Sequence, residues 1–251
     1  MTPLSRRALL TAGVVAAGTS VVASAAALGR RLGLVPPDAA GIYGPGETLT
    51  YATHRLFGRH AMAREFPRDM ISARPFANSV KDRDEAFLAH QAAGFTTWRL
   101  AVDGLIARPT ALTLADLRAT AVSRQITEIS CEEGWSYIAE WIGTPLSAVL
   151  EKAGVAPKAR YVVYQSHDTG FWDSVDLDEA RHPQTLLAWG MNGGDLPVPF
   201  GGPLRMRVPR QLGYKSTKFV NRIVVTDSLA AFGTGKGSAD AEAGYQWYAG
   251  I

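Results

Sequence analysis

The pattern of hydrophobic and polar positions becomes regular near residue 95 and stays regular to the end of the chain. Trp98, Leu100 and Val102 alternate with other residues, which is typical of a half-buried strand. Asn192-Gly193 lies between two apolar runs and predicts a β-hairpin. Runs rich in β-branched or aromatic residues, or with alternating polarity, predict further strands at residues 124–130, 160–166, 204–209 and 218–228.

Helix signals are fewer and define only short elements. Thr113 and Asp116 have the spacing of a capping box and predict a short helix. Thr144, followed by Pro145 at the first helical position, predicts a second helix that ends at Gly154. Because strands outweigh these short, scattered helices and do not alternate with them regularly, the pattern indicates an α+β fold with a mixed β-sheet core.

The part of the chain before residue 95 is irregular. Residues 36–50 are rich in proline and glycine and are predicted to form a linker or surface coil. Residues 51–90 are predicted to be an irregular extension with one helix. We therefore expect three segments. Residues 1–30 are an export signal or anchor, residues 31–94 are a linker and irregular extension, and residues 95–251 are the core. Residues 31–251 are expected to form one globular unit.

The N-terminal segment has the features of an export signal. Ser5-Arg6-Arg7 precedes a long, weakly apolar run of small residues and resembles a twin-arginine signal, which carries folded proteins. Such export is typical of proteins that receive a cofactor before transport, and it implies a periplasmic location. An ordinary secretory signal and a retained membrane anchor are the alternatives, because residues 10–28 approach spanning length.

Charge and cysteine content exclude several classes of protein. Removing residues 1–27 removes Arg6 and Arg7 and no acid, which leaves 24 basic and 23 acidic residues and predicts no nucleic-acid partner. The single cysteine, Cys131, excludes an internal disulfide framework and a zinc site built from several cysteines.

Cys131 lies in EISCEEGW and has three alternative roles. It can be a small buried hydrophobe, since free cysteine is often buried. It can be a nucleophile paired with His167 or His182, although Glu132 and Glu133 would raise the pKa of the thiol and oppose this role. It can also be the one soft protein ligand of a metal whose other ligands come from a cofactor, as for molybdenum held by a pterin dithiolene.

Four segments together resemble the sulfite oxidase-like molybdopterin oxidoreductases, and most of all the bacterial, exported, single-domain branch that includes methionine sulfoxide reductase catalytic subunits. The resemblance begins near Trp98, and its segments are residues 127–154, 161–180, 185–223 and 244–251. It implies a sulfite oxidase-like molybdopterin-binding fold and a Mo-molybdopterin cofactor.

The resemblance also implies roles for particular residues. Cys131 is expected to be the thiolate on molybdenum, and Glu133 to lie near the metal and shuttle protons; a solvated loop acid is the alternative for Glu133. Arg207 is expected on the solvent face of its strand, opposite Arg205. The residues expected to bind the pterin are Asn78, Ser166, Arg205, Ser216, Thr217 and Lys218.

Some positions depart from the family pattern or are open to other interpretations. Phe200 stands where the family usually has histidine or asparagine, so apolar packing against the pterin is expected there. His167-Asp168 is interpreted as a turn rather than a metal pair. The tryptophans are expected to pack the core, with Trp135 also lining the wall of a pocket near Cys131.

The expected function is a periplasmic, monomeric molybdoenzyme that transfers an oxygen atom on a small-molecule substrate. The acids beside Cys131 disfavour a dianion such as sulfite and favour an S-oxide. The sequence has no haem or iron–sulfur motif, so electrons are expected from an external electron-transfer protein, a membrane haem protein being one candidate. The alternative is a non-catalytic binding module that keeps the fold without molybdenum.

Overall fold

The computed structural model describes residues 27–29, 31–41, 44–78 and 83–251. It divides into two units, with the boundary between Gly58 and Arg59. The twin-arginine pattern and most of the apolar run that follows it lie outside the described residues. Within the described ranges, no helix is both long enough and apolar enough to cross a membrane.

The N-terminal part contains more helix than the sequence pattern predicted. Helix α2 (Gly44–Phe57) begins inside the stretch predicted to be a linker or coil. A proline in the first turn is compatible with a helix because the N–H groups there have no partner within the helix, and Glu47 in that turn suits the helix dipole. Residues 51–90 also contain α3 (Glu85–Ala92), which Asp84 caps, and the 3-10 turn η1 (Arg68–Met70), so the prediction of one helix was wrong.

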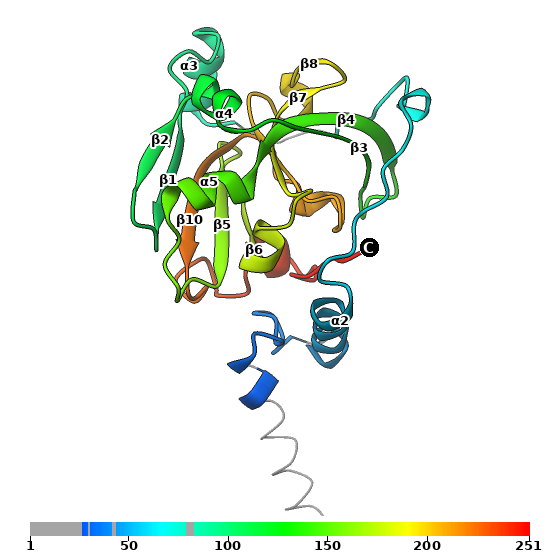
Figure 1. Ribbon diagram of the computed structural model, residues 1–251, viewed down its shortest axis with the longest axis vertical. Helices are drawn as coiled ribbons and strands as arrows, with labels where there is room; N and C mark the ends of the chain where they lie inside the picture. Colours follow the sequence, from blue (N-terminus) through cyan, green and yellow to red (C-terminus); the bar gives the residue numbers. More distant parts are fainter. Residues whose placement is uncertain (1–26, 30, 42–43, 79–82) are drawn as a thin grey trace, which may run out of the picture. The chain divides into compact units, whose positions relative to one another are not determined.

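The first sheet has five strands in the order β2-β1-β10-β5-β6. Strand β1 runs parallel to β10, and the other neighbours are antiparallel (Figure 1). The predicted strand at residues 98–102 is confirmed, because Leu100 and Val102 are buried in β1 and Trp98 is buried just before it. The strands are β1 (Leu100–Gly104), β2 (Thr110–Leu112), β5 (Tyr161–Ser166), β6 (Trp172–Asp176) and β10 (Val220–Thr226).

The second sheet is antiparallel and carries the long β3–β4 hairpin (Figure 1). Its order is β3-β4-β7-β8, and β9 also pairs with β7. Asn192 and Gly193 both have positive φ angles, 50° and 85°, and they form the predicted turn between β7 and β8. The strands are β3 (Ser123–Ser130), β4 (Ser136–Pro145), β7 (Leu186–Met191), β8 (Gly194–Asp195) and β9 (Arg205–Arg207).

The remaining helices are short, as predicted. The capping box of Thr113 and Asp116 is present at the start of α4 (Leu114–Thr120). Helix α5 (Leu146–Ala153) ends at Gly154 in the left-handed conformation, but it begins one residue later than predicted. Thr144 and Pro145 still belong to β4, and the Thr144 hydroxyl donates to the Leu117 carbonyl instead of capping α5. The other elements are α6 (Leu177–Ala180), η2 (Val198–Phe200), η3 (Gly213–Lys215) and α7 (Ala239–Glu242).

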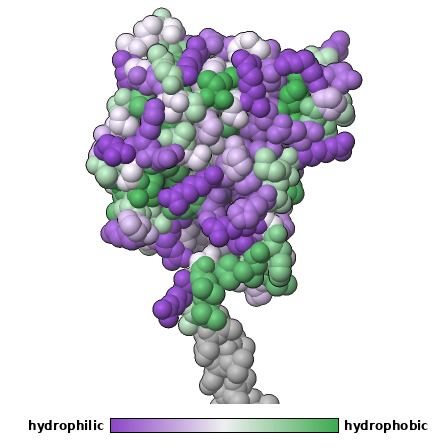
Figure 2. All heavy atoms as spheres, in the orientation of Figure 1, coloured by the Kyte–Doolittle hydropathy of each residue, from purple (hydrophilic) through white to green (hydrophobic). Residues whose placement is uncertain are grey.

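The core joins both sheets. The larger buried cluster includes Leu100 of β1, Leu150 of α5 and Met206 of β9. A smaller cluster under the β3–β4 hairpin includes Ile129, Tyr137 and Trp141, and Trp135 packs against its edge. The visible surface is largely hydrophilic, and the hydrophobic residues on it are dispersed among the hydrophilic ones (Figure 2). The second cluster is important for the site, because it holds both ends of the loop that carries Cys131.

Candidate active site

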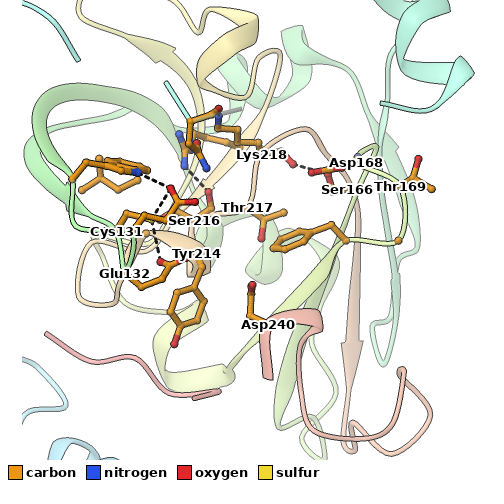
Figure 3. A pocket seen from close by; sticks show the side chains of 18 residues that line it. Cys131, Glu132, Ser166, Asp168, Thr169, Tyr214, Ser216, Thr217, Lys218 and Asp240 are labelled. Atoms are coloured by element: carbon orange, nitrogen blue, oxygen red, sulfur yellow. Dashed lines mark hydrogen bonds between the residues drawn. The ribbon is translucent and has the colours of Figure 1, made fainter. Parts of the chain in front are cut away.

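A pocket of about 650 Å³ lies beside the second sheet (Figure 3). All eight residues that the sequence assigned to the metal, the chemistry or the pterin line this pocket. They are Asn78, Cys131, Glu133, Ser166, Arg205, Ser216, Thr217 and Lys218. They come from separate stretches of the chain, so the fold gathers the predicted set in one place.

Cys131 opens the five-residue loop of the β3–β4 hairpin. Ser130 and Ser136 are the last paired residues of the two strands. The Cys131 N–H donates to the Trp135 carbonyl (2.9 Å), and the Gly134 N–H donates to the Cys131 carbonyl (3.1 Å). Gly134 has a φ of 89°, which glycine adopts without a steric penalty. The loop backbone therefore fixes the position of Cys131 independently of its side chain.

The Cys131 thiol is in an environment that opposes ionisation. Its Sγ lies 3.1 Å from Glu132 Oε2 and 3.8 Å from Glu133 Oε2. Burial, together with the carboxylates of Glu132 and Glu133, raises the pKa of the thiol to about 12. A free thiol with this pKa is a poor nucleophile at neutral pH, which argues against the cysteine-nucleophile alternative. A bound cation would reverse this preference and favour the thiolate.

Glu133 is held by an aromatic wall. Its carboxylate accepts a hydrogen bond from Trp135 Nε1 at 2.7 Å. The Trp135 ring stacks on Tyr137, with centroids 5.8 Å apart and planes 12° apart, and it contacts Phe76 at 5.2 Å. Trp135 therefore lines the pocket as predicted, and it orients the Glu133 carboxylate next to Cys131.

The two cationic side chains that line the pocket, Arg205 and Lys218, have only neutral oxygen partners among the described residues. Arg205 donates to the carbonyls of Phe200 (2.8 Å) and Ser216 (2.6 Å). Lys218 donates to the carbonyls of Asn78 (2.9 Å) and Pro199 (2.7 Å). Burial, followed by the nearby Arg205, lowers the pKa of Lys218 to about 7, and the more distant charges of Asp168 and Glu133 oppose this only in part.

The expectation for Arg207 was wrong. Arg207 is fully buried; its guanidinium bonds the Thr127 hydroxyl and the Glu128 carbonyl of β3, and it does not line the pocket. Residues two apart in a strand face the same side, so period two never placed Arg207 opposite Arg205. Both guanidinium groups lie over the Trp141 ring, at 5.2 Å and 5.4 Å from its centroid. Burial, followed by Arg205, lowers the pKa of Arg207 to about 9.

Small residues also line the pocket that contains the two cations and Cys131. The Ser216 hydroxyl accepts from the Val208 N–H (3.1 Å), and the Ser166 hydroxyl donates to the Lys218 carbonyl (2.8 Å). The Thr217 hydroxyl is buried and has no hydrogen-bond partner among the described residues. A Cβ on Gly213 would lie 3.2 Å from the Ser130 carbonyl oxygen and 3.5 Å from Cys131 Cα, so glycine allows this backbone to approach the Cys131 loop.

Two other expectations have clear outcomes. The Phe200 ring does not line the pocket; it packs edge-on against Tyr137 at 5.9 Å, while its carbonyl supports Arg205. The expected packing of Phe200 on the pterin therefore has no support in this geometry. His167 is buried and its Nδ1 lies 3.0 Å from both Asp84 carboxylate oxygens, which agrees with the turn interpretation of His167-Asp168.

The sequence pattern missed several residues that line the pocket. Asp240 of α7 and Tyr214 of η3 face the pocket from the side opposite Lys218 (Figure 3). Tyr214 contacts the C-terminal segment, because its hydroxyl donates a hydrogen bond to the Gln246 carbonyl (2.6 Å). Ser238 caps α7, but no local pattern in the sequence indicates that this helix returns to the pocket.

The pocket suits an anionic cofactor that carries a soft metal. Buried charges are costly without a partner of opposite charge, and neither Arg205 nor Lys218 contacts a carboxylate in the described part of the chain. A pterin phosphate would supply that negative charge, and the buried Thr217 hydroxyl offers it an additional hydrogen bond. Cys131 supplies the soft ligand.

Residues 88–231 match the oxidoreductase molybdopterin binding domain, and the chain belongs to this family of molybdenum oxidoreductases with a Mo-molybdopterin cofactor. The predicted sulfite oxidase-like fold is confirmed.

Similar proteins include a putative protein-methionine-sulfoxide reductase subunit YedZ1 from Azospira oryzae, 35% identical over 78% of this chain and 70% of the relative. The protein-methionine-sulfoxide reductase catalytic subunit MsrP of Xanthomonas axonopodis pv. citri is 32% identical over 74% of this chain and 62% of its own length. The sulfane dehydrogenase SoxCD of Paracoccus pantotrophus shares the fold, with a TM-score of 0.51 at 21% identity over 68% of this chain and 46% of that chain.

Proposed function

We propose that the protein is a periplasmic reductase that removes the oxygen atom of a small S-oxide, with methionine sulfoxide as the first candidate. The observation that supports this most directly is the pair of carboxylates beside Cys131, at 3.1 Å and 3.8 Å from its sulfur. An anionic substrate such as sulfite would be repelled there, whereas a neutral or zwitterionic S-oxide would not. The names of the two relatives point to the same class of substrate.

Different residues of the pocket would bind the cofactor and transfer protons. Arg205, Lys218 and the Thr217 hydroxyl would hold the phosphate end of the pterin, and the Cys131 sulfur would be the protein ligand of molybdenum. The bound cofactor supplies two-electron oxygen-atom chemistry. Glu133, oriented by Trp135, would deliver a proton to the oxygen that leaves the substrate. Electrons would come from an external redox protein; a haem protein of the membrane is the candidate class.

Substrate preference tests this proposal. With reduced viologen as electron donor, kcat/KM for methionine sulfoxide is expected to exceed that for sulfite oxidation with an artificial acceptor by at least about 100-fold, or roughly 2.7 kcal/mol in transition-state free energy. The molybdenum-loaded full chain is assayed against S-oxides, N-oxides and sulfite. Preference for sulfite would contradict the assignment. Failure of protein purified after export to contain molybdenum would favour the non-catalytic module.

Export by the twin-arginine route gives a separate prediction. Arg6→Lys combined with Arg7→Lys is expected to leave most of the protein in the cytoplasm, because the paired arginines are the feature that this route recognises. The matched control is Arg30→Lys with Arg31→Lys, the same change beyond the apolar run. Fractionation of a host with the twin-arginine pathway measures both. Normal export of the Arg6/Arg7 variant would indicate an ordinary secretory route.

A further inference from the structure

Asp240 is a half-buried residue that lines the pocket, and its carboxyl group has no role in the fold that the described contacts explain. It lies in α7, whose start is capped by the Ser238 hydroxyl, and its own carbonyl accepts from the Tyr245 N–H at 3.0 Å. The backbone is thus fixed. The carboxyl points into the pocket (Figure 3), and its Oδ2 is buried without a hydrogen-bond partner in the described part of the chain. A buried carboxylate oxygen without a hydrogen-bond partner is costly, so this group favours its protonated form.

The neighbouring charges reinforce this preference. Lys215 is fully buried and forms an ion pair with Asp173 of β6, and it also donates to the Ser174 carbonyl at 2.8 Å. The Lys215 ammonium group acts electrostatically on Asp240 as well, but it is already paired with Asp173. A second negative charge beside this pair is unfavourable. Glu132 from the Cys131 loop also acts on Asp240. Tyr164 from β5 is close to both carboxyls, and Glu179 of α6 and Tyr214 of η3 act on it as well.

Burial, followed by repulsion from Asp173, raises the pKa of Asp240 to about 7. The carboxyl is therefore protonated below neutral pH and exchanges its proton near neutrality. A general acid is most effective when its pKa lies close to the working pH.

We propose that Asp240 is a second proton donor of the pocket, which acts together with Glu133 when an S-oxide is reduced. This inference rests on the proposed function. The reaction R₂S=O + 2 e⁻ + 2 H⁺ → R₂S + H₂O breaks the sulfur–oxygen bond and leaves the electron pair on sulfur. Oxygen departs as water, so two protons are consumed per turnover. Electrons come from a reduced donor protein or dye, and the two protons are replaced from bulk water.

Asp240→Asn tests the inference, because asparagine keeps the size of the side chain and cannot release a proton. With methionine sulfoxide and reduced viologen, the wild-type kcat is expected to fall as the pH rises through about 7. In the variant, kcat is expected to be about 100-fold lower with little change in KM, and the fall near neutral pH should disappear. Asp195→Asn, an exposed carboxylate of β8 that pairs with Arg118, is the control and should match the wild type.

Two measurements without turnover separate this role from a structural one. Infrared difference spectra of the wild type should contain a protonated carboxyl band that titrates near neutral pH and is absent from Asp240→Asn. Above neutral pH the ionised Asp240 is a half-buried charge whose Oδ2 has no hydrogen-bond partner among the described residues, and this destabilises the fold. The variant should therefore unfold at the same or a higher temperature than the wild type. A lower unfolding temperature at every pH would indicate a structural role and overturn the inference.

The outcomes are distinguishable. If the wild type reduces no S-oxide, the proposed function fails and the role of Asp240 fails with it. If the wild type is active and Asp240→Asn has the same kcat and the same pH profile, only the inference about Asp240 is wrong. A wild-type spectrum without the carboxyl band would also show that the inference about Asp240 is wrong.

Discussion

Cys131→Ser is expected to abolish reductase activity, with a loss of roughly 1,000-fold or more, on the scale seen when a central catalytic group is removed. Serine is nearly the same size, but its hydroxyl is a hard ligand that does not ionise near neutral pH, so it cannot replace a thiolate on a soft metal. The fold should persist, because the backbone bonds of Cys131 to Trp135 and Gly134 do not involve the side chain. Steady-state activity, molybdenum content and thermal unfolding together measure the effect.

The control for Cys131→Ser is Ser123→Ala, a small change at the first residue of β3, the strand whose other end leads into the Cys131 loop. It should leave both activity and molybdenum content unchanged. An active Cys131→Ser variant that retains its metal would show that the thiol is not the ligand, and Cys131 would then return to the role of a half-buried small residue.

Local signals in the sequence predicted most of the secondary structure. The capping box at Thr113, the Asn192-Gly193 turn and the stop at Gly154 each depend on residues within a few positions of one another. Helix α2 was missed because Gly44, Pro45 and Gly46 were interpreted as coil, although a proline near a helix start does not interrupt its hydrogen bonds. Local rules therefore succeeded except where one residue type suits two structures.

The resemblance to a family identified residues that line the pocket, but it did not predict the other side chains around them. Nothing near Asp240 in the sequence shows that α7 returns to the pocket, because this depends on tertiary contacts such as the Tyr214–Gln246 hydrogen bond. Arg207 was placed on the wrong side by an incorrect use of strand periodicity. Arg207 is buried on the same side as Arg205, because both guanidinium groups pack on the ring of Trp141, a residue of the smaller core cluster.

Alanine substitutions of the two arginines of β9 are expected to differ in how much pterin the protein retains. Arg205→Ala should lose most of its pterin during purification, because it removes a charge-assisted donor from the wall of the pocket. Lys218→Ala should lose less, since the Ser216 and Thr217 cradle remains. Pterin and molybdenum per folded chain are measured in each variant. Arg222→Ala, a partly exposed arginine of β10 that pairs with Asp103, is the matched control and should retain the cofactor.

Arg207→Ala is expected to act on stability and not on binding. It leaves the Glu128 carbonyl and the Thr127 hydroxyl without their buried partner and should lower the free energy of unfolding by about 3 kcal/mol. The chains that remain folded should keep their pterin, because the Arg207 guanidinium does not line the pocket. Arg205→Ala leaves a cavity that opens to the pocket, where water can bond the carbonyls that Arg205 had bonded. The unfolding temperature of Arg205→Ala should therefore fall less than that of Arg207→Ala. Loss of pterin from folded Arg207→Ala with a loaded Arg205→Ala would reverse the two assignments.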